Sequence, residues 1–367
     1  MNNEEKFTDD QEIEGLGKDE DESLGDYPID TLLIRSETRT VHDVIRRTDM
    51  GAFVMDPDFQ RDFIWDNNKQ SKLIESVLMR IPLPVLYLAE DEKGRMIVVD
   101  GLQRLTTFQR FVKNQLQLKL SNQPDLDKKF FRDLSPKLQN RVEDFNLILY
   151  IIDAKVPERA RLDIFDRVNS GVPLSRQQMR NCLYNGQATR FLKNEAATEL
   201  FIMATGGSLR TQSMRDREFV NRFCAFSLLS LDTYRNEMDE WLARALKQMN
   251  GMSQTELFKL SQSFQNSLIN NYILFKEHAF RKHNPLQDRR SVLNASLWDI
   301  MTTGLSKYSQ DQVQVHSDKL KKMFYAILDD ERFIWSITYG PNSQDRVKYR
   351  FEAIRKILAE VFGDKSS

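Results

Sequence analysis

The chain has 367 residues with nearly balanced charge, 53 Lys and Arg against 54 Asp and Glu, and 40% of its residues are hydrophobic. Ten prolines, fourteen glycines and 23 phenylalanines form a composition that packs into a core, which excludes fibrous, collagen-like and wholly disordered proteins. At about 150 residues per domain, this length predicts two domains. The longest strongly apolar run, residues 147–152, is far shorter than the roughly 20 residues that span a bilayer, so we expect no membrane segment.

The amino-terminal segment is strongly acidic. Residues 1–30 contain twelve Asp and Glu but only two Lys, a local charge of -10 that the rest of the chain offsets. Such a composition predicts an acidic disordered tail over residues 1–28. Alternatively, this tail competes with nucleic acid for a basic surface on the body of the protein. The absence of a secretory signal pattern and the presence of only two cysteines predict a cytoplasmic protein.

Residues 29–155 mix strand and helix patterns and are predicted to form the first domain. Thr40 is a suitable cap for a helix through Arg47, and Asn67 or Asn68 for a second helix. Two short apolar runs separated by a turn predict paired strands, and apolar residues at helical spacing follow them. The expected strands span residues 85–88, 96–99 and 147–152, and the expected helix spans residues 105–112.

Residues 156–367 read as an almost wholly helical second domain. Amphipathic segments follow one another without a fixed repeat, which favours a helical bundle over a solenoid. The predicted fold class is therefore α+β, a small mixed sheet followed by a helical domain. The expected long helices lie around residues 187–204, 216–231, 235–249, 254–280, 290–307, 310–329 and 345–362.

The sequence from Val98 to Thr107 concentrates polar groups where a predicted strand turns into a helix. Gly101 lets a ligand approach the backbone, and the free N–H groups of a new helix favour an anion such as phosphate. Arg104 offers a planar fork of donors, while Asp100 and Gln103 are suited to hold a metal, a ribose hydroxyl or a water. An ordinary turn and a surface ion pair of Arg104 would explain the same residues.

Three segments in order, residues 59–65, 97–107 and 165–175, carry a Gln-Arg pair before Trp65, an Asp-Gly…Gln-Arg-Leu-Thr-Thr signature and an Asn-Ser-Gly turn. The sequence resembles the amino-terminal domain of GmrSD-type restriction endonucleases, a ParB/sulfiredoxin-like domain, over roughly residues 35 to 190. One position departs from the family signature. Leu102 stands where the family has the first of two glutamines, which implies impaired hydrolysis if that glutamine takes part in it.

The resemblance implies a nucleoside triphosphate-binding and hydrolysing module of a DNA restriction or phage-defence system, with Mg²⁺ as cofactor. Asp100 would orient the metal or the water and, with Gln103 and Arg104, form the catalytic set. Gly101 would admit the phosphates and Arg104 would neutralise them. The other nucleotide-binding residues implied by the resemblance are Gln60, Arg61, Thr106 and Thr107.

Some relatives carry a His-centred nuclease motif, which the four scattered histidines of this chain do not form, so we expect cleavage to belong to a nuclease partner. His278 and His283 are five residues apart, which predicts different faces of one helix. DNA is the expected partner, and two basic clusters are candidates for backbone contacts or, alternatively, for solvated, ion-paired surfaces. The first contains Arg210, Arg215, Arg217 and Arg222, and the second contains Arg281, Lys282, Arg289 and Arg290.

The same residues are compatible with two other functions. The chain could be a DNA-binding or regulatory scaffold with a vestigial nucleotide pocket, which Leu102 favours. It could also be a metal-dependent DNA nickase that uses the carboxylate of Asp100.

Overall fold

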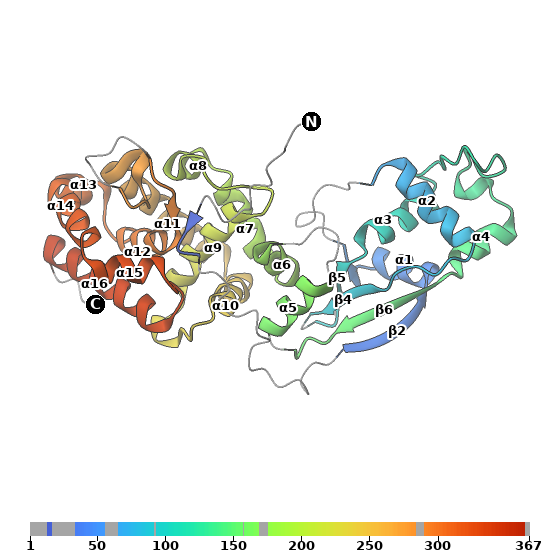
Figure 1. Cartoon of the computed structure of the whole chain (residues 1–367), viewed down its shortest axis with the longest axis horizontal. Helices are drawn as coiled ribbons and strands as arrows, with labels where there is room; N and C mark the ends of the chain where they lie inside the picture. The colour runs from blue at the N-terminus through green and yellow to red at the C-terminus, as the bar shows by residue number, and fades with distance from the viewer. Residues whose placement is uncertain are drawn as a thin grey trace. The chain divides into compact units, whose positions relative to one another are not determined.

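The structure is a computed structural model that describes residues 13–16, 34–55, 65–91, 93–156, 158–168, 175–283 and 290–363 (Figure 1). It divides into two compact units. We call Gly25–Leu183 the sheet unit, and Met1–Leu24 together with Tyr184–Ser367 the helical unit. The sequence placed the boundary at residue 155, but helices α5 (Glu158–Val168) and α6 (Arg176–Leu183) belong to the sheet unit.

The reason for this difference lies in the packing of α5. Arg161 donates from Nη2 to the backbone oxygen of Glu90 at 3.1 Å, and Phe165 is fully buried. These contacts tie the first helix after the sheet to a strand of the sheet.

The sheet unit contains a five-stranded mixed sheet in the order β2-β6-β4-β5-β3. Strands β2 and β6 are antiparallel, as are β4 and β5, while β4 pairs with β6 and β3 with β5 in parallel. The predicted small mixed sheet is confirmed, including the pairing across the turn at residues 91–94. The strands are β2 (Ile34–Thr40), β3 (Phe53–Val54), β4 (Leu86–Glu90), β5 (Met96–Asp100) and β6 (Asn146–Ile152).

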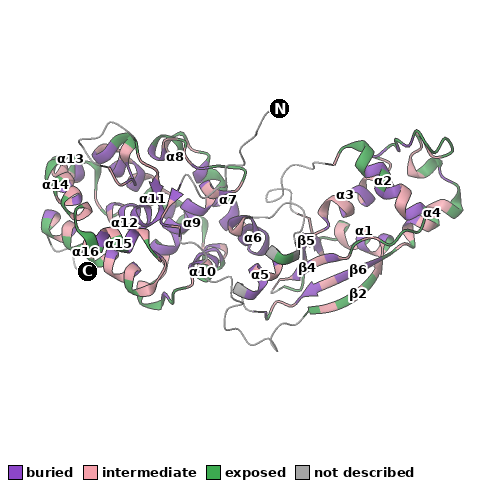
Figure 2. Cartoon of the chain, in the orientation of Figure 1, coloured by how far each residue is buried: buried purple, intermediate pink, exposed green. Residues whose placement is uncertain are grey.

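Helices α1 to α4 pack on one face of this sheet (Figure 1), and both these helices and the strands carry residues coloured as buried in Figure 2. Buried hydrophobic residues of the helices and strands form one core cluster. Thr40 caps α1 as predicted, by accepting from the N–H of Asp43. The cap of α2 is Asp66, one residue before the predicted asparagines. The bounds are α1 (Val41–Asp49), α2 (Asn67–Leu78), α3 (Leu102–Val112) and α4 (Pro136–Glu143), with a short 3-10 helix at Phe131–Asp133.

The helical unit surrounds an aromatic core. Trp298 is fully buried and its ring contacts those of Phe201, Phe219 and Phe280. Two predicted long helices are each broken into two shorter ones, α7 with α8 and α13 with α14. The helices are α7 (Gln187–Ala196), α8 (Glu199–Thr205), α9 (Arg215–Leu228), α10 (Met238–Asn250), α11 (Gln254–Phe275), α12 (Ala295–Leu305), α13 (Gln310–Val315), α14 (Ser317–Leu328), α15 (Glu331–Thr338) and α16 (Gln344–Phe362), with 3-10 turns at Leu231–Thr233 and Lys276–His278. Among the described residues, no helix combines the length and apolarity that crossing a bilayer requires.

Part of the predicted acidic tail is ordered in the helical unit. Strand β1 (Ile13–Glu14) pairs in parallel with β7 (Leu293–Asn294), and the side chain of Ile13 is buried. Lys282 forms an ion pair with Glu14 at 2.8 Å. The prediction of a disordered tail over residues 1–28 is therefore wrong for residues 13–16, because an apolar residue and a pairing strand anchor them. Residues 1–12 and 17–33 lie outside the described part.

Candidate functional site

The signature residues lie where β5 turns into α3. Asp100 ends the strand, and Gly101 has a φ of 102°, in the left-handed region. A Cβ at Gly101 would lie 2.0 Å from Cδ2 of Leu86, so only glycine fits this turn. No side chain caps α3, and within the described residues the N–H groups of Leu102 and Gln103 have no acceptor. The helix start is therefore open to an anionic ligand.

Asp100 and Arg104 form an ion pair beside this helix start, with 2.7 Å between Oδ2 and Nη2. Arg104 also donates to the backbone oxygens of Pro84 and Val85 and its side chain is only 11% exposed, whereas that of Asp100 is 36% exposed. Burial raises the pKa of Asp100 despite the nearby guanidinium, and burial lowers the pKa of Arg104. Arg104 therefore holds the carboxylate and the loop before β4, while the carboxylate stays accessible.

Gln103 connects the first two segments of the resemblance. Its Oε1 accepts from the backbone N–H of Trp65 at 3.3 Å, and Nε2 of Gln70 donates to the backbone oxygen of Trp65 at 2.8 Å. Trp65 is partly buried against the core, as an anchor would be. Gln60 and Arg61 precede it in the chain and lie outside the described residues. Trp65 is thus bonded to the start of α3.

Thr107 and Leu102 both serve the packing of α3. The side chain of Thr107 is fully buried and its hydroxyl donates to the backbone oxygen of Gln103 at 2.7 Å. The expected role of Thr107 as a donor at the helix start is therefore not supported by its position. Leu102 packs against the hydrophobic core, and Thr106 is partly exposed on the same helix.

The first basic cluster is largely engaged within the helical unit. Arg215 pairs with Glu218 at 2.7 Å, and Arg217 donates to Sδ of Met214 at 3.7 Å. Arg222 is buried and paired with Asp299, which excludes it from a surface contact. Arg210 is exposed. This cluster fits the ion-paired alternative better than a row of free cations.

The two histidines near the end of α11 contradict the prediction of different helix faces. The rings of His278 and His283 stack with their centroids 3.7 Å apart, because α11 ends at Phe275 and the chain turns back. Burial and the neighbouring His278 lower the pKa of His283. The described residues contain no group of three or more His, Cys, Asp or Glu side chains that could hold a metal.

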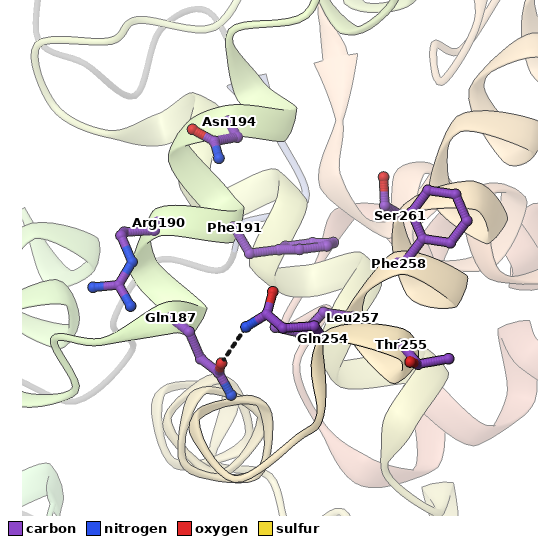
Figure 3. A pocket seen from close by; sticks show the side chains of 9 residues that line it. All are labelled: Gln187, Arg190, Phe191, Asn194, Gln254, Thr255, Leu257, Phe258 and Ser261. Carbon is purple, nitrogen blue, oxygen red and sulfur yellow. Dashed lines mark hydrogen bonds between the residues drawn. The ribbon is translucent and has the colours of Figure 1, made fainter.

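A groove that the sequence did not predict lies within the helical unit, between α7 and α11 (Figure 3). It has a volume of about 640 Å³, and Phe191, Phe258 and Arg190 are among its lining residues. Phe258 is 62% exposed, although phenylalanine in this helix is expected in the core. The sequence carries no signal for this exposure, because adjacent apolar pairs such as Leu73-Ile74 of α2 are buried together elsewhere in the chain. None of the predicted site residues lines this groove.

The sheet, its helices and the open strand-to-helix corner define an α+β domain suited to holding a ligand at a helix start. Residues 38–185 match the model of the GmrSD restriction endonuclease N-terminal domain, and this part of the chain belongs to that domain family. The match includes the whole corner and ends two residues beyond α6. No curated protein and no solved structure matches the chain.

Proposed function

We propose that the chain is the nucleotide-binding and hydrolysing module of a DNA restriction or phage-defence system. The observation that carries the proposal is the uncapped start of α3 beside a partly exposed carboxylate, inside a segment of a restriction-endonuclease domain family. A helix start with free N–H groups favours phosphate oxygens through both hydrogen bonds and the helix dipole.

Each residue of the corner has a role in this proposal. The N–H groups of Leu102 and Gln103 donate to phosphate oxygens, and Gly101 presents no side chain there. Arg104 keeps Asp100 in place rather than neutralising phosphate itself. Gln60 and Arg61 would complete the phosphate contacts from the preceding segment.

Mg²⁺ fits this donor set. Magnesium is commonly bound by one or two carboxylates together with substrate phosphates and water, not by an all-protein cage. Asp100 would be its protein ligand, and the ion would supply charge neutralisation between the carboxylate and the phosphates. Gln103 Oε1, now accepting from Trp65, would orient a water from the same turn.

The proposal assigns DNA cleavage to a nuclease partner and places the system in the cytoplasm. The assignment to a DNA restriction system is supported by the family to which residues 38–185 belong.

Binding and turnover of ATP, GTP, CTP and UTP with Mg²⁺, with and without duplex DNA, test the proposal. We expect the natural chain to bind nucleotide, and Asp100→Asn to lose Mg²⁺-dependent binding and turnover while keeping the side-chain shape. Arg104→Ala should weaken binding indirectly by releasing Asp100. Asp49→Asn is the matched control, because Asp49 pairs with Lys113 on the surface of the same unit. Absence of nucleotide binding by the natural chain under all conditions would overturn the proposal.

A second function, a DNA-binding scaffold with a vestigial pocket, is favoured by one observation. Leu102, the departure from the family signature, packs against the core, and so hydrophobic packing has replaced a polar group at the site. The variant Leu102→Gln separates the two functions. If the pocket is active, turnover should rise with nucleotide affinity unchanged; if it is vestigial, DNA binding should persist in Asp100→Asn and no variant should hydrolyse nucleotide.

A further inference from the structure

Two arginines nine residues apart in sequence converge at the carboxyl end of α8, more than seventy residues earlier in the chain. Arg281 donates from Nη2 to Oγ of Ser208 at 2.8 Å and to the backbone oxygen of Thr205 at 2.9 Å. Arg290 donates from its own Nη2 to the same Oγ of Ser208 at 3.4 Å. Two guanidinium groups therefore meet at a single hydroxyl oxygen.

Neither guanidinium has an acidic partner in the described part of the chain. Arg281 is only 2% exposed, and its remaining contacts are the backbone oxygens of Glu277 and Ser291. Burial and then the charge of Arg290 lower the pKa of Arg281 to about 10. Buried charges in proteins are normally paired, because leaving water without a counter-charge is costly.

Arg290 is the accessible member of the pair. It is exposed, and its contacts with the backbone oxygen of Gly206 are long, at 3.5 Å. A Cβ at Gly206 would lie 2.3 Å from Nη1 of Arg290, so the glycine leaves the space in which this guanidinium lies. Because these contacts are long, the donors of Arg290 can turn to a ligand.

Lys282, next to Arg281 in sequence, does not belong to this cluster of free charge. It pairs with Glu14 at 2.8 Å and donates to the hydroxyl of Thr338. Arg289 lies outside the described residues. Among the described members of this basic cluster, the two arginines around Ser208 carry the positive charge without an acidic partner.

We propose that Arg281, Arg290 and the hydroxyl of Ser208 form an anion site that takes a phosphate group, supplied by the DNA backbone. A phosphate oxygen would accept from the planar fork of Arg290, and its charge would offset the repulsion between the two guanidiniums. Arg281 is the buried charge that keeps the site positive, while Arg290 makes the direct contact. The DNA source rests on the proposed function; the anion site itself does not.

The test measures duplex DNA affinity against salt concentration for the full chain, Arg290→Gln and the control Arg355→Gln. Arg355 is an exposed arginine on α16 and its removal changes the net charge equally. Losing one phosphate contact should reduce the slope of log K against log salt by about 0.9 and weaken binding about tenfold at low salt. Arg355→Gln should change neither quantity. Equal effects of the two variants on the slope would overturn the DNA source.

A second measurement separates the source of the phosphate from the site itself. Inorganic phosphate should raise the melting temperature of Arg290→Gln by less than that of the natural chain and of Arg355→Gln. If phosphate has this effect while the DNA slope is unchanged, the site takes a free anion and not the backbone. If neither phosphate nor DNA distinguishes Arg290→Gln from Arg355→Gln, the anion site is refuted. Asp100→Asn should retain the Arg290-dependent slope, so failure of the nucleotide proposal remains a separate result.

Discussion

The two units use arginine–aspartate pairs in opposite ways. In the sheet unit, Arg104 holds Asp100 at the edge of the α3 corner, where the carboxylate keeps 36% of its surface exposed. In the helical unit, Asp299 is fully buried between Arg222 and Arg350, at 2.7 Å and 3.3 Å. The first pair orients an accessible group, and the second fixes helices α9, α12 and α16 together.

An arginine in a basic cluster indicates a ligand contact only once its partners in the fold are known. Arg222 appeared in the sequence as one of four neighbouring cations, yet both ends of its fork bind Asp299. Arg104 appeared as a phosphate ligand, yet it contacts a carboxylate and two backbone oxygens. Arg281 and Arg290 have no acidic partner among the described residues, and their charge is therefore available to a ligand.

The largest effect is expected for the buried cluster. Asp299→Asn leaves Arg222 and Arg350 without a counter-charge, which should cost about 3–5 kcal/mol of unfolding free energy. Urea unfolding followed by tryptophan fluorescence measures this loss, since Trp298 lies in the same core. The exposed Asp311→Asn on α13 is the control and should change stability by less than about 0.5 kcal/mol. Similar values for the two variants would show that Asp299 does not fix the helical unit.

A smaller loss is expected at the turn before α3. Gly101→Ala forces a side chain into a left-handed conformation and against Leu86, for a combined cost of about 2–4 kcal/mol. Gly51→Ala is the matched control, because Gly51 also has a positive φ, 73°, but nothing lies within 4 Å of its added Cβ. The control should lose only about 1 kcal/mol. Equal losses in chemical denaturation would mean that the contact with Leu86 does not constrain the corner.

Removing the connection between α3 and Trp65 should have a modest effect on stability. Gln103→Ala leaves the N–H of Trp65 without its acceptor, which should cost about 1 kcal/mol. The loss of nucleotide-binding free energy should exceed the loss of unfolding free energy, because the segment before Trp65 carries Gln60 and Arg61. Gln109→Ala, on the same helix and bonded to Asp49, is the control for both measurements. The role of Gln103 would be contradicted if the two variants bound nucleotide equally.

The smallest effect is a difference in pH dependence between two carboxyls of the sheet unit. Burial raises the pKa of Asp100 above 3.8, so its folded form binds more protons and stability falls as the pH rises through the interval above that value. Burial also raises the pKa of Asp43, but hydrogen bonds from Arg46, Arg39 and Arg47 outweigh burial and lower this pKa well below its usual range. The stability that Asp43 contributes is present above pH 3.8 and is lost as the pH falls.

The urea concentration at the midpoint of unfolding, measured between about pH 3 and pH 6, checks whether Asp100 and Asp43 have opposite effects on the pH dependence of stability. The stability of Asp100→Asn relative to the natural chain should rise with pH, whereas that of Asp43→Asn should fall with pH and then level off. Parallel curves for the two variants would show that the corner carboxyl is not shifted upward.

Local sequence patterns predicted much of the sheet unit. The apolar runs at residues 85–88, 96–99 and 147–152 became β4, β5 and β6, and most residues of β4 and β5 are buried, as continuously apolar strands predict. Strand β2 was missed, since it lies at the sheet edge and carries Arg35, Glu37 and Arg39 in alternation. Arg35 of this strand forms an ion pair with Glu90 of β4 at 2.7 Å, and only the folded sheet brings these two residues together.

The candidate site was predicted in its location but not in its contacts. The order of strand, Asp-Gly and helix sufficed to place the corner at residues 100–104. Arg104 binds the backbone oxygens of Pro84 and Val85, and Thr107 faces the core. Both contacts depend on which strand lies beside β5, which is a property of the tertiary fold. The meeting of Arg281 with Arg290 beside α8 was equally beyond local pattern, because Ser208 is more than seventy residues away in sequence.

The pairing of β1 with β7 has a consequence for how the chain is made. Glu14 contacts Asn294 across 280 residues, and the backbone oxygen of Leu16 accepts from Asn342 across 326 residues. During synthesis the amino-terminal strand emerges first, but its partner strand leaves the ribosome only when most of the chain has been translated. At a synthesis rate of roughly 5–20 residues per second, β1 remains unpaired for tens of seconds, during which the sheet unit can fold. The helical unit, whose first strand is translated at the start, is therefore completed last.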